Sequence, residues 1–534
     1  MNGPSTLCLI TLAGCTVFDE RLPPKPDCYT NLECSDQLGE PALCVETGTV
    51  DEPAASCVKL LSEDCQTITG DHLDDNAVVI ASLLSTTGAQ ASTNIPRQQS
   101  AIMAVEEINE SNASGGILMS TAPGDTKKLV MLSCDEIANL PRVATHLISE
   151  LHLPAIVGPN LSQDTIDLTL GNDAIGLPSS AQGGTLLITP VAVANAIANL
   201  PDNGLVYQMV PTDVQRVPLM KAQINALETM LKTQRTLTKI KLGIFYRDDA
   251  LGKGTSDALT TLTINGGTLA QAISRGEVRV DSYDPALAAD SPLVATYANT
   301  FQPDIIVIVG TAEAVKYFMV PLEAAWPTAN RPYYVAIDST KVPDLITAVK
   351  ASTNGLRQRV RGTGVVTPPE SLSVFTAFQV QYGQRWKDAM GNPQPATISN
   401  MGPTYDAVFA VALALVGQSM VTGATIAAGL PRLATNTQTC TYDGAGFLQS
   451  PCYAVTDYSR TLYRNMTQLL DDQPVTEIGT FGRLEWDSLG AKASGIIEMW
   501  CIDYSGTNPV FASSGLTYDV KTQQTSGTYV PCPP

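Results

Sequence analysis

The residues best placed for chemistry directly follow short apolar runs in the sequence. Two of these runs are 77–84 and 154–157. The residues that follow them are Ser85 and Thr86 after the first run, and Asn160, Leu161 and Ser162 after the second. Short apolar runs followed by helical periodicity predict a parallel sheet covered on both faces. In such sheets, ligands bind beyond the carboxyl ends of the strands, where helix N-termini offer free N–H groups. The pattern therefore predicts a site for a polar or anionic small molecule.

A second series of apolar runs also ends in residues that could contact a ligand. Thr311 follows the run 304–310, and Asp338 follows the run 333–337. A carboxylate at a strand end is a suitable partner for a cationic group of a ligand. The alternative for Asp338 is an N-cap of the helix expected near Val342. Two such α/β series predict two lobes, each a doubly wound parallel sheet, with a cleft between their strand ends.

Length and composition fit a globular protein of several domains. A chain of 534 residues is too long for one core, and 44% hydrophobic with 16% charged residues is ordinary globular composition. The formal charge of −20 argues against a nucleic-acid partner, which would need a clustered basic face. The sequence contains no run of eighteen apolar residues, so it predicts no membrane-spanning helix. The expected segments are a lipoprotein signal peptide and lipobox (1–15), a tether and cysteine-rich module (16–70), lobe 1 (76–205 and 340–430) and lobe 2 (206–339 and 431–534).

Catalytic chemistry has little support in the sequence. His146 and His152 are six residues apart and lie on different faces of a helix, which makes them a poor metal pair. The segment Gly252–Thr255 (GKGT) resembles a phosphate loop only superficially, because a glycine separates its lysine from the hydroxyl. No G-x-S-x-G motif occurs, and Cys134 fits a disulfide better than a nucleophile. We therefore predict no enzyme, no metal and no cofactor.

The cysteines indicate an oxidising compartment. Setting aside Cys8 and Cys15 leaves ten of the twelve, an even number. Five of the ten lie in a short polar segment that is too small to bury a core: Cys28, Cys34, Cys44, Cys57 and Cys65. We expect disulfides to stabilise this segment, since zinc-ligand spacing is absent. The connectivity cannot be read from the sequence, but Cys440 and Cys452 flank a short turn and are expected to pair.

The N-terminus has features of an export signal. Residues 7–13 are apolar, and Leu12–Cys15 (LAGC) resembles the bacterial lipobox, in which the cysteine is lipidated. The usual basic n-region is missing, because the first basic residue is Arg21. The alternative is a chance LAGC within an ordinary signal peptide. If Cys15 is lipidated, its acyl chains tether a soluble body to a membrane.

Five short motifs follow one another along the chain. They are Leu84-Ser85-x-x-Gly88, Ala104-Val105-x-x-Ile108-Asn109, Ile156-Val157-Gly158-Pro159-x-x-Ser162, Ile188-Thr189-Pro190 and Tyr405-Asp406-Ala407. In this order, they resemble the motifs of type I periplasmic binding proteins. From Ala77 to Asp503, the sequence resembles the leucine/isoleucine/valine-binding branch, the receptors of ABC importers. The resemblance implies two lobes joined by a three-crossover hinge that closes on a ligand, preceded here by the small cysteine-rich module.

The resemblance also implies roles for individual residues. In the family, a serine hydroxyl and backbone N–H groups hold the ligand's carboxylate. These groups correspond here to Ser162 and to the main chain of Asn160 and Leu161, although Ser162 could instead only cap its helix. Asp338 corresponds to the acid that pairs with the ligand's ammonium group, and Thr311 to a contact from the second lobe.

One segment departs from the family pattern. Amino-acid-binding members carry a threonine or serine shortly after the proline of the I-T-P motif, whereas this chain continues with Val191–Ala194 (VAVA). Without a hydroxyl here, either the ligand is not an amino acid or backbone carbonyls do the work. Val191 and Val193 remain candidate ligand contacts on the second interpretation.

These features favour a lipid-anchored receptor in the periplasm or cell envelope. It would bind an amino acid or similar small polar molecule and deliver it to an ABC permease. One alternative is an envelope lipoprotein that uses the same fold for protein–protein regulation, as activators of cell-wall synthases do; another is a sensory ligand-binding subunit. The polar strand ends favour the receptor, whereas the hydroxyl-poor Val191–Ala194 segment and the cysteine-rich leader favour the regulator.

The lipobox hypothesis predicts that Cys15→Ser releases the protein from membranes. Without the thiol there is no site for acyl transfer, and the sequence predicts no spanning helix to replace the anchor. Fractionation of cells that express each form measures the distribution. A Cys15→Ser protein that is still wholly membrane-bound would contradict the anchor.

Overall fold

The computed structural model describes residues 27–46, 54–110, 115–436, 438–444, 446–456 and 461–532. Cys15 and the rest of the expected signal peptide lie outside these residues. The chain divides into two compact units, Met1–Lys59 and Leu60–Pro534. Within the described residues, no helix combines the length and the apolar character needed to cross a membrane.

The first unit is a small module held by two disulfides. It contains helix α1 (Asn31–Leu38) and the antiparallel strands β1 (Ala42–Glu46) and β2 (Ala55–Lys59). Cys28 bonds to Cys44, and Cys34 bonds to Cys57. Its buried apolar residues are few, so the two covalent links supply the stability that so small a core cannot.

Lobe 1 of the second unit is built on a six-stranded sheet. Its order is β10-β9-β8-β4-β7-β3, and all neighbours are parallel except the edge strand β3. The strands are β3 (Cys65–Thr69), β4 (Val78–Leu84), β7 (Leu129–Asp135), β8 (Ala155–Val157), β9 (Leu186–Thr189) and β10 (Val206–Gln208). The helices between them are α2 (Ala91–Glu110), α3 (Leu140–Ala144), α4 (Ser162–Leu170) and α5 (Ser180–Gly183). The short strands β5 (Ile117–Leu118) and β6 (Thr126–Lys127) form a separate hairpin.

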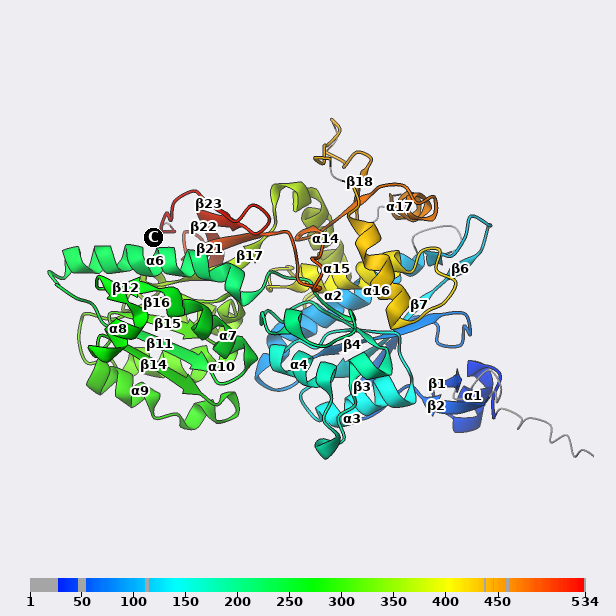
Figure 1. Ribbon diagram of the computed structural model, residues 1–534, viewed down its shortest axis with the longest axis horizontal. Coiled ribbons are helices and arrows are strands. Elements are labelled where there is room, and N and C mark those ends of the chain that lie inside the picture. Colours follow the sequence, from blue (N-terminus) through cyan, green and yellow to red (C-terminus); the bar gives the residue numbers. More distant parts are fainter. Residues whose placement is uncertain are drawn as a thin grey trace, which may run out of the picture. The chain divides into compact units, whose positions relative to one another are not determined.

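Later segments of the chain complete lobe 1. They comprise α14 (Leu372–Arg385), α15 (Met401–Ala414), α16 (Gly423–Gly429), α17 (Thr461–Leu470) and the small sheet of β18 (Cys452–Ala454), β19 (Thr476–Gly479) and β20 (Gly482–Arg483). Every residue of α15 is buried, which explains why its sequence is apolar on all sides. α15 packs along α2, as Figure 1 shows.

Lobe 2 is built on an eight-stranded sheet of order β14-β11-β15-β16-β17-β21-β22-β23. The first five strands are parallel: β11 (Leu242–Arg247), β14 (Val278–Tyr283), β15 (Ile305–Val309), β16 (Tyr333–Ala336) and β17 (Val360–Val366). Three antiparallel strands extend it: β21 (Ile496–Asp503), β22 (Val510–Asp519) and β23 (Gln524–Ser526).

Helices cover both faces of this second sheet, so each face has its own hydrophobic core. They include α6 (Asp213–Gln234), α7 (Ala250–Ala258), α8 (Leu269–Ser274), α10 (Ala312–Ala314), α11 (Val320–Ala325), α12 (Pro343–Ala351) and α13 (Leu356–Arg359). The strand β15 is buried throughout, as expected for a parallel strand between two helical layers. The two α/β lobes with parallel sheets confirm the predicted fold class.

The chain passes between the lobes three times: between β10 and α6, between β17 and α14, and between β20 and β21. The expected boundaries were partly wrong. β3 was assigned to the cysteine-rich module, β10 to lobe 2, β17 to lobe 1 and β18–β20 to lobe 2. Each of these short strands joins the sheet in which a partner strand is available. The partner cannot be predicted from the sequence of the strand alone.

Three further disulfides lie in the second unit: Cys65–Cys134, Cys440–Cys452 and Cys501–Cys532. The expected Cys440–Cys452 pair is confirmed. The assignment of Cys65 to the cysteine-rich module was wrong, because Cys65 lies on β3 opposite Cys134 of β7. This bond fixes the only antiparallel strand of the first sheet to its neighbour.

Loop length predicts how much each of these disulfides stabilises the second unit. Cys65 and Cys134 are 69 residues apart, and Cys440 and Cys452 are 12 apart. On the chain-entropy model, replacing both cysteines by alanine should lower the free energy of unfolding by about 4 kcal/mol for the longer loop and about 3 kcal/mol for the shorter. Denaturant titration of the two double variants measures the difference. A larger loss for the Cys440/Cys452 variant would contradict the assigned order.

Candidate functional site

A cavity lies between the two lobes, at the carboxyl ends of strands from both sheets. The centre of a water molecule can reach ≈ 30 Å³ of it. Seven of the nine predicted ligand-binding residues line it: Asn160, Leu161, Ser162, Val191, Val193, Thr311 and Asp338. Sequence reasoning thus brought together residues from two lobes that are more than 110 positions apart in the chain.

Ser162 is the first residue of α4 and points its hydroxyl to a neighbouring loop. Its Oγ accepts hydrogen bonds from the backbone N–H groups of Val193 (3.1 Å) and Ala194 (3.2 Å). The N-cap position is Leu161, whose side chain cannot cap, so the capping role considered for Ser162 was wrong. As in any helix, the first N–H groups of α4 have no acceptor inside the helix, and the first residue, Ser162, lines the cavity.

The backbone approach to α4 depends on Gly158. Its φ is +139°, and a Cβ there would lie 2.2 Å from the carbonyl oxygen of Leu83 on β4. Only glycine permits so close a contact between the loop after β8 and the neighbouring strand. This packing holds Asn160 and Ser162 at the edge of the sheet.

The Val191–Ala194 segment connects the site to the first crossover. The N–H of Asp213, at the start of α6, donates to the carbonyl of Val193 (2.7 Å), and Asp213 Oδ1 accepts from the N–H of Asn195 (3.1 Å). Gln208 Nε2 donates to the carbonyls of Ala192 and Ala194. These carbonyls are therefore engaged within the protein, while the side chains of Val191 and Val193 line the cavity.

Ser85 and Thr86 do not line the cavity. The Ser85 hydroxyl donates to Glu136, and the Thr86 N–H donates to Asp135 Oδ1 (3.2 Å). Glu136 also accepts from the N–H of Asn160 (2.8 Å), and burial raises the pKa of Glu136 well above its usual range. Ser85 is therefore linked to the cavity-lining Asn160 through Glu136, and Thr86 bonds to Asp135.

Arg97, on α2, is the cation of the lobe 1 wall. It is 6% exposed, lines the cavity and donates through Nε to the carbonyl of Ser399 (2.8 Å). Its Nη1 donates to the side-chain oxygens of Asn94 (2.9 Å) and Asn160 (3.1 Å). Burial lowers the pKa of Arg97 to about 10, with partial compensation from the charges of Asp338 and Glu136, so the guanidinium stays charged at neutral pH.

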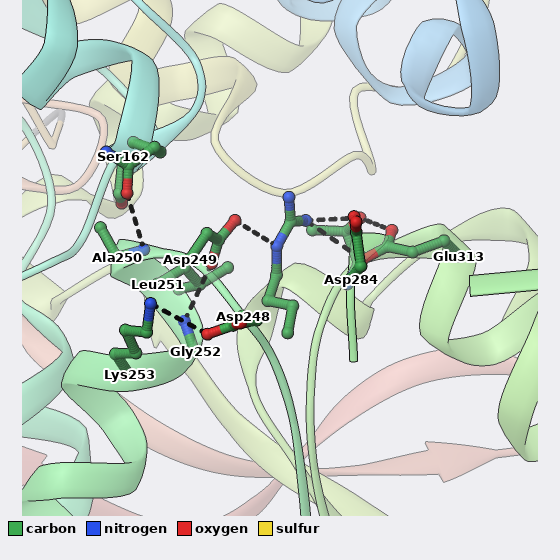
Figure 2. Close-up of polar contacts among 12 residues, drawn as sticks. Ser162, Asp248, Asp249, Ala250, Leu251, Gly252, Lys253, Asp284 and Glu313 are labelled. Carbon is green, nitrogen blue, oxygen red and sulfur yellow. Dashed lines mark hydrogen bonds and ion pairs between the residues drawn. The ribbon is translucent and has the colours of Figure 1, made fainter. Parts of the chain in front are cut away.

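The lobe 2 wall holds Arg247 between two carboxylates. Arg247 ends β11 and donates to Asp249 (2.5 Å) and to Glu313 (3.1 Å). Thr311 donates its backbone N–H to Glu313 (3.1 Å), and the Thr311 hydroxyl also bonds to this carboxylate. Figure 2 shows Asp249 and Glu313 approaching from opposite sides. Burial opposes the charge of Arg247, but Glu313 and Asp249 raise its pKa overall.

Asp338 forms a fully buried ion pair. Its Oδ2 accepts from Arg216 Nη2 of α6 (2.8 Å), and its Oδ1 accepts from the N–H of Ser339 (3.1 Å). The alternative of a helix N-cap was wrong, because the residue at the cap of α12 is Val342. Lys341 also lines the cavity on the lobe 2 side, and its Nζ lies 3.8 Å from Glu498 Oε1.

Sequence patterns did not reveal these cations, for different reasons. Arg247 and Lys341 lie at or shortly after the ends of apolar runs, as the predicted ligand contacts do. The prediction considered only polar and acidic residues at these positions, so it did not include these two basic residues. Arg97 is different, because it lies inside a helix and reaches the site only through the packing of α2 against Ser399. Between the lobes, the Ala250 N–H donates to Gln163 Oε1 (3.2 Å).

Comparisons with known proteins identify the class of fold. No protein-family model matches the chain, and no curated protein matches its sequence. Solved structures match with low sequence identity, so they show the fold of type I periplasmic binding proteins. One is the branched-chain amino acid transporter substrate-binding protein LivJ from Streptococcus pneumoniae, in complex with isoleucine. It is 15% identical, with a TM-score of 0.52, over 82% of this chain and 99% of that one.

Two other solved structures illustrate the range of ligands on this fold. The leucine-binding protein LivK from Thermotoga maritima is 15% identical with a TM-score of 0.52, over 82% of this chain and 98% of that one. A solute-binding protein of an ABC transporter from Rhodopseudomonas palustris was solved with 3,4-dihydroxybenzoic acid. It is 13% identical with a TM-score of 0.53, over 83% of this chain and 98% of that one.

The first crossover should make stability depend on pH through Asp213. Burial raises the pKa of Asp213 to about 6 from 3.8, and its Oδ2 is buried without a hydrogen-bond partner. A raised folded-state pKa gives stabilisation that is present below the ordinary pKa and is lost as pH rises through about 6. Asp213→Asn should therefore gain stability relative to the unmodified protein as pH rises from about 4 to about 7.

Melting temperatures measured across this range test the effect, with Asp173→Asn at an exposed position as the matched control. The control should follow the unmodified protein. Parallel pH profiles for Asp213→Asn and the unmodified protein would show that Asp213 stays ionised throughout.

Proposed function

We propose that this protein is an extracytoplasmic ligand-binding receptor that binds a small polar molecule between its lobes by hinge closure. The observation that carries the proposal is the cavity itself, which joins the free N-terminus of α4 and the buried Arg97 on one wall to Thr311 and Asp338 on the other. A charged buried side chain at a cavity between two lobes is typical of a ligand site. The receptor has no enzymatic activity.

The fold supports a role in solute uptake. The solved structures with this fold include receptors of ABC transporters bound to isoleucine and to an aromatic acid. By analogy, the ligand is an amino acid or a related small polar molecule, and the partner is an ABC permease. Lipidation of Cys15 would hold the receptor at the membrane of the cell envelope.

A regulatory role is the second candidate, and an exposed groove on lobe 1 favours it. Leu372, Val380 and Phe447 line the groove and are 55%, 47% and 63% exposed. Exposed apolar side chains in one groove are typical of protein-binding surfaces. In that case the lobes would serve a protein partner, and the cavity would bind no small molecule.

Filling the cavity separates the two functions. Val191→Trp places a large side chain at the lining of the cavity, so it should abolish any rise in melting temperature that a ligand causes. The ligand screen covers amino acids, small carboxylates and polyols. Leu170→Trp, at the exposed end of α4, is the matched control and should keep the full response.

A broad screen without any thermal shift would refute the receptor. A shift that survives Val191→Trp would place the ligand elsewhere. Only a shift that the cavity variant loses and the control keeps agrees with the proposal.

A further inference from the structure

The two walls of the cavity differ in how their charges are satisfied. On the lobe 1 wall, all three hydrogen bonds described for Arg97 end on uncharged oxygens, those of Ser399, Asn94 and Asn160. None of these bonds uses Nη2. A buried guanidinium normally pairs with a carboxylate, because desolvating a cation without a counter-charge is costly. The charges of Asp338 and Glu136 act on Arg97 only through space, and none of the three hydrogen bonds joins it to a carboxylate, so an anion at the cavity would complete its compensation.

The surroundings of Arg97 suit an anion. Residues Gln90 and Thr93 of the same region line the cavity beside it, and the free N–H groups of α4 begin at Ser162. A helix N-terminus favours negative charge, and a guanidinium offers two parallel N–H donors to a carboxylate. Glu136, whose charge acts on Arg97, already accepts hydrogen bonds from Ser85 and from the N–H of Asn160.

The acids of the lobe 2 wall, in contrast, are satisfied within the protein. Both oxygens of Asp338 accept hydrogen bonds, from Arg216 and from the N–H of Ser339. Both oxygens of Asp249 do so as well, from Arg247 and from the N–H of Gly252 (3.1 Å). A cationic group on a ligand would have to compete with a buried arginine for either acid.

We infer that the ligand is a small carboxylic acid that forms an ion pair with Arg97, and that it needs no cationic group. This inference rests on the proposed receptor function and specifies its ligand class. It departs from the ammonium-binding role expected for Asp338, because Arg216 occupies that carboxylate. The carboxylate of the ligand would lie against Arg97 and the start of α4, with the rest of the molecule facing Val191 and Thr311.

The test uses compounds that share a shape and differ in charge. For an aliphatic skeleton these are 4-methylpentanoate, its amide and its amine, with leucine as the zwitterion. For an aromatic skeleton they are benzoate, benzamide and benzylamine. Titration calorimetry and thermal shift with the full chain should detect binding of at least one acid, and neither the amide nor the amine of that skeleton should bind.

Variants identify the group that holds the acid. Arg97→Gln should weaken binding of the acid by about 30-fold or more, as expected when one partner of a buried charge pair is removed. Arg97→Lys should restore part of the affinity, because it keeps the charge without the bidentate geometry. Arg385→Gln removes a half-exposed arginine that pairs with Glu106 elsewhere on lobe 1, and it should leave binding unchanged.

Each outcome decides the inference. Equal binding of acid and amide, binding of the amine, or full affinity in Arg97→Gln overturns it. The comparison of acid with amide needs no variant, so a poorly folded Arg97→Gln protein leaves the test intact. If leucine or a neutral compound binds in a Val191→Trp-sensitive manner while no acid alone binds, the receptor function stands and this inference fails. If no compound of any charge binds, this inference fails, and the broad screen described above decides the receptor function separately.

Discussion

The cost of burying charge is the constraint on which the rest of this structure depends. Arg97, Arg216, Arg247 and Asp338 are all less than a tenth exposed. Three of them line one cavity, and Arg216 pairs with Asp338. Buried charges are tolerated only when partners compensate for lost hydration. In lobe 2 these partners are oppositely charged side chains: Arg216 pairs with Asp338, and Arg247 pairs with Glu313. The two pairs hold the start of α6, the strand ends and the helical segment after β15 in fixed positions relative to one another. In lobe 1 the compensation is incomplete.

The same constraint explains the placing of neutral polar groups. Ser162 binds the N–H groups of Val193 and Ala194 instead of capping α4, and Asn160 bridges Arg97 and Glu136. Buried backbone donors must find acceptors, and a hydroxyl at the first turn of a helix is close enough to supply one. The loop that lacks hydroxyls is therefore held by a hydroxyl from its neighbour. It is also tied to Asp213, so the ligand wall and the first crossover form one connected network.

Periodicity and strand-end chemistry predicted most of the fold and much of the site. Buried parallel strands such as β15 are short apolar runs, and their ends necessarily meet at one edge, so Ser162, Thr311 and Asp338 could be placed together before the structure was known. Pairing partners were harder to predict. The sequence of β3 is as polar as that of the cysteine-rich module, to which it was assigned, but β3 pairs with β7 of lobe 1. β17 belongs to the second sheet, although helices of lobe 1 follow it directly.

The remaining errors have a common physical origin, because they concern contacts between residues distant in sequence. Asp338 was correctly placed at the cavity, but its neutralisation by Arg216 arises from α6, more than 120 positions earlier. Arg97 reaches the cavity because α2 packs beside the loop that carries Ser399. Neither contact leaves a local pattern. Charge at a site is decided by which cation and which anion the fold brings together, and a single strand end shows only one of them.

The discontinuity of lobe 2 has a consequence for synthesis of the chain. Its central strand β17 pairs on one side with β16 and on the other with β21, which follows some 130 residues later. Until β21 arrives, β17 presents an unpaired row of N–H and C=O groups, the kind of edge that invites pairing with other chains. Because α14 and α15 of lobe 1 are synthesised between β17 and β21, the edge of β17 in lobe 2 stays unpaired while lobe 1 is being completed. A chaperone that covers extended segments would be needed longest at this strand, and a chain that stops before β21 would keep the flank permanently.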